Sequence, residues 1–286
     1  MKMLKSVKLK DYFIYYAYTK VRASVEFIVY TLPNMKKLLA TKKLKDTKRG
    51  KSAFVFANGP SLKIIDPEKI NRYQKEGYDV FAGNSFINTY FGKIVDPNFY
   101  IFSDPAHFGI FDNQISENRK KECINDFKNI VSSGITLFVP HRYCRRVFYK
   151  NSYVFNDTFD VFSSNVKNVL KRRPYVSMTL FKALSIACYM GYEDIYICGF
   201  DNDYFKSIRV DEDNNVMYEE NHFYDDARSE NIKIQSPLYS TIAETLLSFH
   251  TLFLGLEMFK KENIINLDPN GLVDCFTKKH ELDIYK

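Results

Sequence analysis

The chain has 286 residues, of which 45% are hydrophobic. This is enough for one sizeable core with an appendage and too little for two full domains. The formal net charge of +7 is distributed unevenly, because residues 1–51 carry a net charge of +11 and residues 52–286 a net charge of −4. No nucleic-acid-binding module accompanies this local excess, so we expect no nucleic-acid partner. The five cysteines have no CxxC spacing, which indicates neither a zinc site nor a disulfide framework and favours a reducing cytoplasm.

Residues 1–49 form a basic, aromatic extension that we expect to be helical. Aromatic runs at 12–18 and 27–30 are interleaved with Lys and Arg, a composition that suits a helix lying on an anionic membrane surface. A helix packed on the domain or on a partner, with solvated lysines, is the alternative. Charged residues interrupt every window long enough to cross a bilayer, and no apolar region leads to a cleavage site. We therefore expect a cytoplasmic protein with peripheral contact on the inner face of a membrane, and a linker from Thr41 to Lys51.

Five short apolar runs predict the strands of the domain at 50–286. They are β-branched, aromatic and continuous rather than alternating, which is typical of strands covered on both faces by helices. These runs lie at residues 54–57, 78–84, 98–104, 135–141 and 194–201. A sixth candidate at 263–267 follows a long helical segment near the carboxyl end. The pattern predicts an α/β fold with a mostly parallel sheet.

The turn after the first strand, Asn58-Gly59-Pro60-Ser61, resembles a nucleotide-binding turn. Glycine permits close approach by a phosphate or sugar, and proline suits the first position of a helix. Asn58 or Ser61 can supply polar contacts to the ligand. Short glycine turns after strands are also common for purely structural reasons.

Polar residues close the other strands at the same end. In open α/β sheets the ligand lies outside the carboxyl ends of the strands, so these residues should face one crevice. They are Asn58, Asn84, Asp104, His141 and Asp201.

The strongest helix signal runs from Ser177 to Gly191. Serine can cap the start, the body is apolar on nearly every side, and glycine can end the helix in the left-handed conformation. We expect this helix to be buried. Its amino end, with Ser177 and Thr179, could bind an anion through free backbone N–H groups and hydroxyls.

Two further features carry candidate chemistry. His222 lies in a polar, aromatic loop where a general base belongs, and His141 at a strand end is a weaker second choice. Asp201 and Asp203 directly follow a strand and could hold Mg²⁺ on a nucleotide's phosphates, although Asp201 could instead bind a ribose hydroxyl.

Four ordered blocks of the sequence resemble bacterial sialyltransferases of glycosyltransferase family 42. The blocks are 57–62, 83–86, 191–201 and 221–224. Wider relatives, including flagellin nonulosonate transferases and archaeal 6-hydroxymethylpterin diphosphokinase-like proteins, share the first and third blocks. The resemblance covers about residues 52–275. It implies a Rossmann-like variant of the GT-A fold that transfers a nonulosonic acid, typically sialic acid, from a CMP-activated donor to a glycan hydroxyl with inversion and no metal cofactor.

The resemblance also implies roles for individual residues. Asn58, Gly59 and Ser61 match the nucleotide-binding turn, Asn84 contacts the cytidine phosphate or sugar, and Ser177 or Thr179 matches a serine at the start of the buried helix. His222 matches the base that deprotonates the acceptor hydroxyl. Tyrosines stabilise the leaving phosphate in the family, and the nearest here are Tyr204, Tyr218 and Tyr224. The interval from Asp201 to His222 is shorter than in the sialyltransferases, so we expect a small lid at about 203–235.

Two rival functions remain open from the sequence. One is a Mg²⁺-dependent diphosphokinase that uses ATP. The other is a catalytically silent sugar-nucleotide-binding protein in polysaccharide assembly, recruited by its amino-terminal extension.

Overall fold

An eight-stranded parallel sheet forms the centre of the computed structural model, which describes residues 9–111, 116–160, 162–174, 178–217 and 241–279. The strand order is β10-β9-β6-β1-β2-β3-β4-β5, and every neighbouring pair is parallel. The strands are β1 (Ser52–Phe56), β2 (Asp79–Gly83), β3 (Phe99–Ile101), β4 (Thr136–Pro140), β5 (Ser152–Phe155), β6 (Asp194–Cys198), β9 (Ile264–Asn266) and β10 (Thr277–Lys278). The parallel sheet and all six predicted strands are confirmed.

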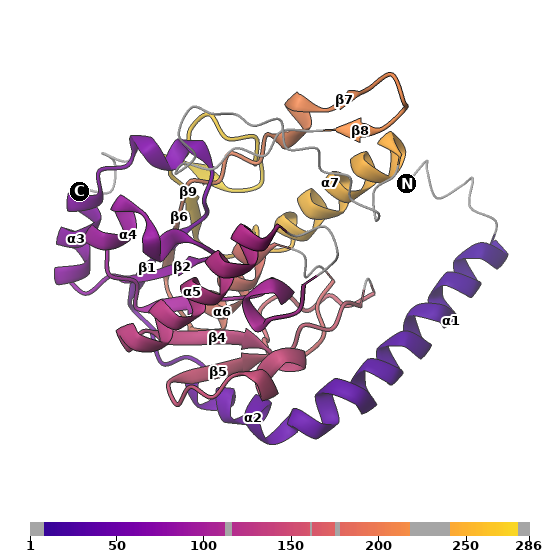
Figure 1. The fold of residues 1–286 in the computed structure, drawn as a ribbon, viewed down its shortest axis with the longest axis horizontal. Helices are drawn as coiled ribbons and strands as arrows, with labels where there is room; N and C mark the ends of the chain where they lie inside the picture. Colours follow the sequence, from indigo (N-terminus) through magenta and orange to yellow (C-terminus); the bar gives the residue numbers. More distant parts are fainter. Residues whose placement is uncertain (1–8, 112–115, 161, 175–177, 218–240, 280–286) are drawn as a thin grey trace.

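Helices cover both faces of this sheet (Figure 1). On one face lie α6 (Thr179–Met190) and α7 (Ile242–Glu257), and on the other lie α3 (Pro67–Lys75), α4 (Tyr90–Ile94) and α5 (Glu117–Ser133). Successive residues of β1 divide between the two layers, with Val55 in the first core and Phe54 in the second. Both faces of the strands are therefore buried, which explains why their sequences are continuously apolar.

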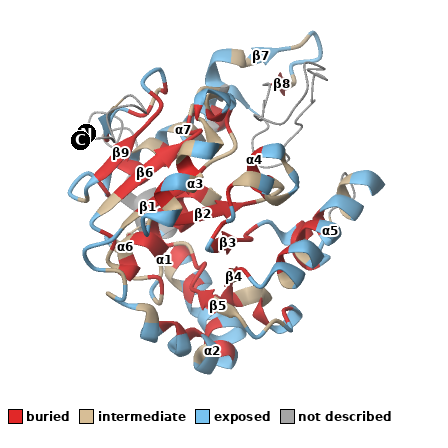
Figure 2. Cartoon of the chain, turned by 90° about the vertical axis from the view of Figure 1, so that its left-hand side faces the viewer, coloured by how far each residue is buried: buried red, intermediate tan, exposed pale blue. Residues whose placement is uncertain are grey.

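Burial is concentrated in the sheet and in α6 (Figure 2). Ten of the twelve residues of α6 are buried, as its apolar sequence predicted. The helix ends at Gly191, whose φ of 87° gives the predicted left-handed stop.

Short 3₁₀ turns follow the strands at the end of the sheet where their carboxyl termini lie. They are η5 (Pro60–Ile64), η6 (Phe86–Asn88), η7 (Pro105–Phe108), η8 (His141–Arg146) and η9 (Tyr204–Ser207). A small hairpin of β7 (Arg209–Val210) and β8 (Val216–Met217) comes after η9. It occupies the first part of the predicted lid, and the rest of that segment, 218–235, lies outside the described residues.

The amino-terminal arm, residues 9–51, is largely helical as predicted. It contains α1 (Leu9–Glu26), a π-helical turn η2 (Phe27–Thr31), η3 (Leu32–Asn34), α2 (Met35–Ala40) and η4 (Thr41–Leu44). Leu38 is buried against the core, and the Thr41 hydroxyl bonds both the N–H and the C=O of Val154 in β5. The predicted linker is thus packed onto the domain. Among the described helices, none is long and apolar enough to cross a bilayer.

The order in which the chain adds strands to the sheet reverses between β1 and β6. From β1 the chain adds β2 to β5 on one side, then returns through α6 and places β6 on the other side of β1. In open α/β sheets a crevice forms outside the carboxyl ends of the strands at such a point. The topology alone therefore locates a candidate site beyond Phe56 and Cys198.

Candidate functional site

A cavity of about 260 Å³ lies at this reversal point. Five chain segments line it, at the ends of β1, β2, β3 and β6 and at the start of α6. The lining segments are 56–60, 82–84, 101, 178–180 with 183, and 199–203. The structure thus brings together Asn58, Gly59, Asn84, Thr179 and Asp201 around one space.

The turn after β1 is fastened to the end of β6 by a carboxylate. Pro60 occupies the first position of η5, as predicted. Asp201 accepts hydrogen bonds from the Ser61 N–H at 3.1 Å and from the Ser61 hydroxyl at 2.8 Å. Ser61, predicted to contact a ligand, instead donates to the protein's own carboxylate. Asp201 therefore takes the place that an anion would occupy at the start of this turn.

Gly59 is required by the same contact. A Cβ built on Gly59 would lie 2.1 Å from Oδ2 of Asp201 and 2.7 Å from the Gly199 carbonyl oxygen. From the sequence we expected Gly59 to permit the close approach of a ligand. In the structure the group that approaches Gly59 is the side chain of Asp201, in the loop after β6.

Burial raises the pKa of Asp201, and the nearby carboxylates of Asp268 and Asp203 raise it further, while the hydrogen bonds from Ser61 oppose the shift. Both oxygens of this carboxylate bond Ser61, so its role in the structure is to join the two loops. These bonds and the raised pKa make it a poor Mg²⁺ ligand. Asp203 is only half-buried and pairs with Lys206 at 3.5 Å. Among the residues that the structure describes, no three His, Cys, Asp or Glu side chains gather as a metal site.

Two amide side chains in the cavity wall have unused hydrogen-bonding atoms. Asn202 is 3% exposed, and neither its Oδ1 nor its Nδ2 has a partner among the described residues. Oδ1 of Asn58 is likewise buried without a partner there. Buried amides are normally satisfied by protein or by ordered water, so these atoms are available to a polar molecule in the cavity. The sequence analysis missed Asn202, the residue between Asp201 and Asp203, because no sequence signal marks its burial; in the structure it has a left-handed φ of 51°.

The end of β2 is shaped to leave room for the cavity. Asn84 takes a left-handed φ of 56°, and its carbonyl accepts a hydrogen bond of 2.7 Å from the Tyr100 hydroxyl. A Cβ on Gly83 would lie 2.8 Å from the Ile101 carbonyl oxygen and 2.9 Å from Cγ2 of Thr179. Gly83 therefore lets the start of α6 approach β2 and β3 closely.

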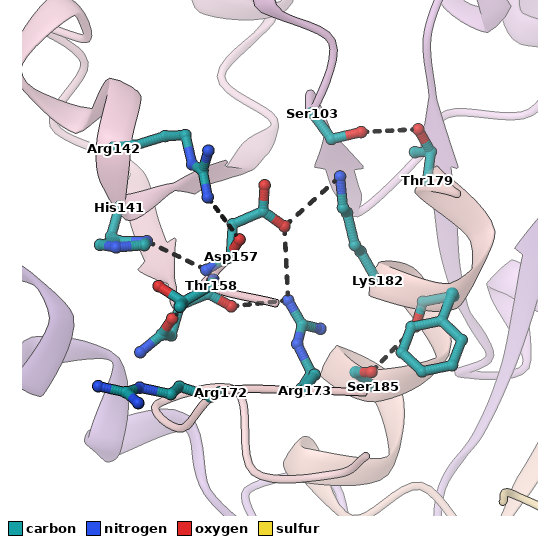
Figure 3. A network of polar contacts seen from close by, with 12 residues as sticks. Ser103, His141, Arg142, Asp157, Thr158, Arg172, Arg173, Thr179, Lys182 and Ser185 are labelled. Carbon is teal, nitrogen blue, oxygen red and sulfur yellow. Dashed lines mark hydrogen bonds and ion pairs between the residues drawn. The ribbon is translucent and has the colours of Figure 1, made fainter. Parts of the chain in front are cut away.

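The amino end of α6 opens into the cavity. The helix begins at Thr179 with Met178 as its N-cap residue, and the Met178 side chain makes no capping hydrogen bond. The predicted cap, Ser177, lies outside the described residues. Uncapped N–H groups at the start of a 12-residue helix are available to a ligand's negative charge. Thr179 is held in place through a 2.8 Å hydrogen bond between its hydroxyl and that of Ser103 (Figure 3).

A buried cationic cluster anchors α6 one turn further on (Figure 3). Nζ of Lys182 lies 3.5 Å from Oδ1 of Asp157, and Nη2 of Arg173 lies 3.9 Å from the same oxygen. Arg173 is fully buried and Lys182 is 3% exposed. Burial lowers the pKa of both groups, that of Arg173 to about 10, while Asp157 opposes the shift. One carboxylate thus holds two buried cations beneath the cavity wall.

Two predicted crevice residues do not line the cavity. Asp104 is exposed and accepts a hydrogen bond from the Ala106 N–H, so it caps η7. His141 is fully buried: its Nε2 contacts the Thr31 hydroxyl at 3.2 Å, and its Nδ1 accepts from the Asp157 N–H at 3.0 Å. The prediction that His141 faces the crevice is therefore wrong. The His141 side chain instead bonds Thr31 and so helps to hold the amino-terminal arm on the domain.

His141 should make folding sensitive to acid. Burial, and then the positive charge of Arg142, lowers the pKa of His141 from 6.5 to about 4. Below pH 6.5 the unfolded chain binds the proton first, so stability should fall as the pH drops from 6.5 towards 4, by about 3 kcal/mol in total. His141→Gln, which cannot titrate, should lose that much less in urea unfolding measured at pH 7.5 and pH 4. Equal losses in both proteins would contradict this assignment.

The remaining predicted site residues lie near or beyond the described segments. His222, Tyr218 and Tyr224 lie outside the described residues. Tyr204 begins η9, directly after the cavity-lining residue Asp203.

One comparison with known proteins identifies a family for this chain. Residues 30–207 match the model of the family described as MptE-like, 6-hydroxymethylpterin diphosphokinase MptE-like. No sequence among the curated proteins matches this chain. A solved structure, the MAf glycosyltransferase from Magnetospirillum magneticum AMB-1, is similar at 12% identity with a TM-score of 0.37, over 81% of this chain and 44% of that one. Because the family match covers more than half of the 286 residues, the chain belongs to the MptE-like family, and its parallel sheet gives it a Rossmann-like fold.

Proposed function

We propose that the cavity binds the nucleotide of a CMP-activated nonulosonic acid, and that the protein transfers this sugar to a glycan hydroxyl. The observation that carries the proposal is the cavity at the β1–β6 reversal, where the unpaired amide of Asn202 and the unpaired Oδ1 of Asn58 lie with the amino end of α6. Polar groups with different chemistry converge there on one small space. Amides suit a base or ribose, and helix N–H groups suit a phosphate.

The electrostatics of the wall favour a donor with a single phosphate. The described lining residues include Asp201 and Asp203 and no Lys or Arg. The CMP part of the donor bears one phosphodiester charge, which the partial positive charge of the α6 amino end can offset, while the carboxylate of the nonulosonic acid belongs to the transferred sugar. A triphosphate brings about four negative charges and would need cations that this wall does not supply.

The size of the cavity suits part of a sugar nucleotide. Its volume of about 260 Å³ lies just below the range of about 300–1,000 Å³ of ordinary ligand sites. We therefore assign the nucleotide to the enclosed space and the transferred sugar to its mouth. An acceptor hydroxyl must reach the sugar from outside, so we assign the base to a residue that does not line the described cavity.

The proposed chemistry divides between the cavity and the segment that follows it. Breaking the bond between the nonulosonate and CMP leaves a phosphate anion, which N–H groups at Thr179 and beyond can stabilise. His222 removes the proton of the acceptor hydroxyl as that oxygen attacks the anomeric carbon. One displacement inverts the centre and requires no covalent intermediate. Tyr204, Tyr218 and Tyr224 are the proposed additional donors to the leaving phosphate.

The amide of Asn202 should contribute measurably to CMP binding. Asn202→Gly removes the amide while glycine accepts the left-handed φ of 51°. Losing two hydrogen bonds should weaken CMP binding about tenfold in titration calorimetry. Asn214→Gly is the matched control, since Asn214 also has a positive φ, 61°, but is exposed in the β7–β8 hairpin. Unchanged CMP affinity in Asn202→Gly would remove this amide from the site.

The family description favours a second candidate, an ATP-dependent diphosphokinase. In that case Mg²⁺ would have to bring a triphosphate to Asp201 and Asp203. A thermal-shift panel of CMP, CDP, UDP, GDP and ATP, each with and without magnesium, separates the two. Our proposal predicts that saturating CMP raises Tm by about 5 °C or more without magnesium. A shift with ATP and magnesium, and none with CMP, would favour the diphosphokinase.

A further inference from the structure

The helices of the amino-terminal arm turn their polar side toward the domain and their apolar side toward solvent, the reverse of an ordinary surface helix. From residue 16 to residue 34 the side that faces the domain is small or polar, and its buried residues are Thr19, Ala23, Glu26, Thr31 and Asn34. The side that faces away is apolar. We call it the outer stripe, and it consists of Tyr18, Val21, Val25, Ile28, Val29 and Leu32, each between 52% and 64% exposed. A surface helix normally buries such a stripe against its own core.

Polar contacts fix which side of the arm faces the domain. Lys20 pairs with Asp160 at 3.3 Å, and the Arg172 guanidinium donates to the Ala23 carbonyl at 2.9 Å. Further along, Nδ2 of Asn34 donates to the carbonyl of His141 at 3.1 Å. These contacts hold α1, η2 and η3 in one rotational setting, so the outer stripe cannot turn inward without breaking them.

The surroundings of the outer stripe are positively charged. Residues 16–45 contain seven Lys or Arg and a single acidic residue, Glu26, which is buried and bonded to Arg22. Exposed basic residues flank the stripe and continue along α2 and η4. They are Arg22, Lys36, Lys37, Lys42, Lys43 and Lys45. The next carboxylate, Asp46, pairs with Lys45 and Arg49. An apolar band with a predominantly basic border is suited to an anionic surface.

We propose that the outer stripe binds the surface of an anionic phospholipid bilayer, with the arm lying in the plane of the interface. Its apolar residues would enter the boundary between headgroups and acyl chains, and the flanking basic side chains would pair with lipid phosphates. The described helices are unsuited to crossing a membrane, which agrees with a peripheral mode. This proposal is independent of the substrate assigned to the cavity.

Charge decides between a lipid surface and a second copy of the chain. Two copies joined through their outer stripes would bring two basic borders together, and like charges in contact oppose association. Anionic lipid removes this repulsion and adds roughly 1 kcal/mol for each basic residue near the surface. The same border that disfavours self-association therefore favours the bilayer.

Vesicle co-sedimentation of the full chain tests the proposal. We expect the protein to bind phosphatidylcholine vesicles that contain about 30% phosphatidylglycerol, to bind pure phosphatidylcholine at least about tenfold more weakly, and to be released by about 0.5 M salt. The triple variant Val21→Ser, Val25→Ser, Ile28→Ser should reduce the partition coefficient at least about tenfold. All three positions are exposed, so folding should be preserved.

A matched triple variant on α7 provides the control. Leu246→Ser, Leu247→Ser and Leu254→Ser remove exposed apolar side chains of 48% to 55% exposure from another helix and should leave vesicle binding unchanged. Absence of binding to anionic vesicles would overturn the proposal, as would equal loss in both triple variants. So would a wild-type dimer in light scattering that the outer-stripe variant converts to a monomer, since the stripe would then be an interface between copies.

Discussion

Asp157→Ala should lower the free energy of unfolding by about 3–5 kcal/mol, because it leaves Arg173 and Lys182 buried without their shared carboxylate. Arg173 cannot lose its proton at neutral pH, even with a pKa lowered to about 10. The surviving charge must therefore either stay desolvated or draw water into the base of α6. Urea unfolding monitored by circular dichroism measures the loss.

Two further variants make this prediction specific. Adding Lys182→Met to Asp157→Ala should recover part of the loss, because one of the two uncompensated cations is removed. Asp203→Ala is the control, since half-buried Asp203 and exposed Lys206 form a pair that is open to solvent and worth at most about 1 kcal/mol. If Asp157→Ala costs no more than Asp203→Ala, the cluster does not hold α6 in the way described.

His222→Ala should reduce sugar transfer about 10²- to 10⁴-fold while leaving CMP affinity nearly unchanged. In our proposal the described cavity binds the nucleotide, whereas His222 acts only on the acceptor hydroxyl. The measurement compares the rate of transfer from CMP-activated sialic acid to a cell-envelope glycan extract with CMP affinity from calorimetry.

His250→Ala is the matched control for this variant. His250 is an exposed histidine of α7, and its loss should change neither transfer nor CMP affinity. Full activity of His222→Ala would remove His222 from the mechanism. A parallel loss of CMP binding would instead make His222 part of the nucleotide site.

Most of the sheet could be predicted from the sequence because burial on both faces leaves a continuous apolar run in each central strand. The edges of the sheet were harder. At one edge β5 is only partly buried in its first half, and at the other β10 has two exposed residues, so neither carries the same signal. The starting point of α6 was also misjudged, since Met178 rather than Ser177 is its N-cap residue.

The candidate site was predicted in outline and misread in detail. The sequence indicates that Asn58, Asn84, Thr179 and Asp201 follow elements whose ends converge, and the structure places all four around one cavity. It could not indicate that Asp201 binds Ser61, because this contact joins residues 140 positions apart. A glycine turn that accommodates a side chain of the same protein leaves the same sequence pattern as one that accommodates a phosphate.

The arm illustrates a different limit. Its basic and aromatic composition suggested two alternatives, packing on the domain or contact with lipid. The structure shows that the two are compatible, because the polar side packs and the outer stripe remains exposed. The composition of a helix does not indicate which of its sides packs against the domain.

The central claim is that a cytidine nucleotide occupies the cavity at the β1–β6 reversal. The most direct test is a crystal structure of the protein grown with CMP. We predict electron density for CMP within the cavity, with its phosphate at the amino end of α6 and its polar edge within hydrogen-bonding distance of Asn58 or Asn202. An empty cavity at saturating CMP, or CMP bound on another surface, would contradict the account.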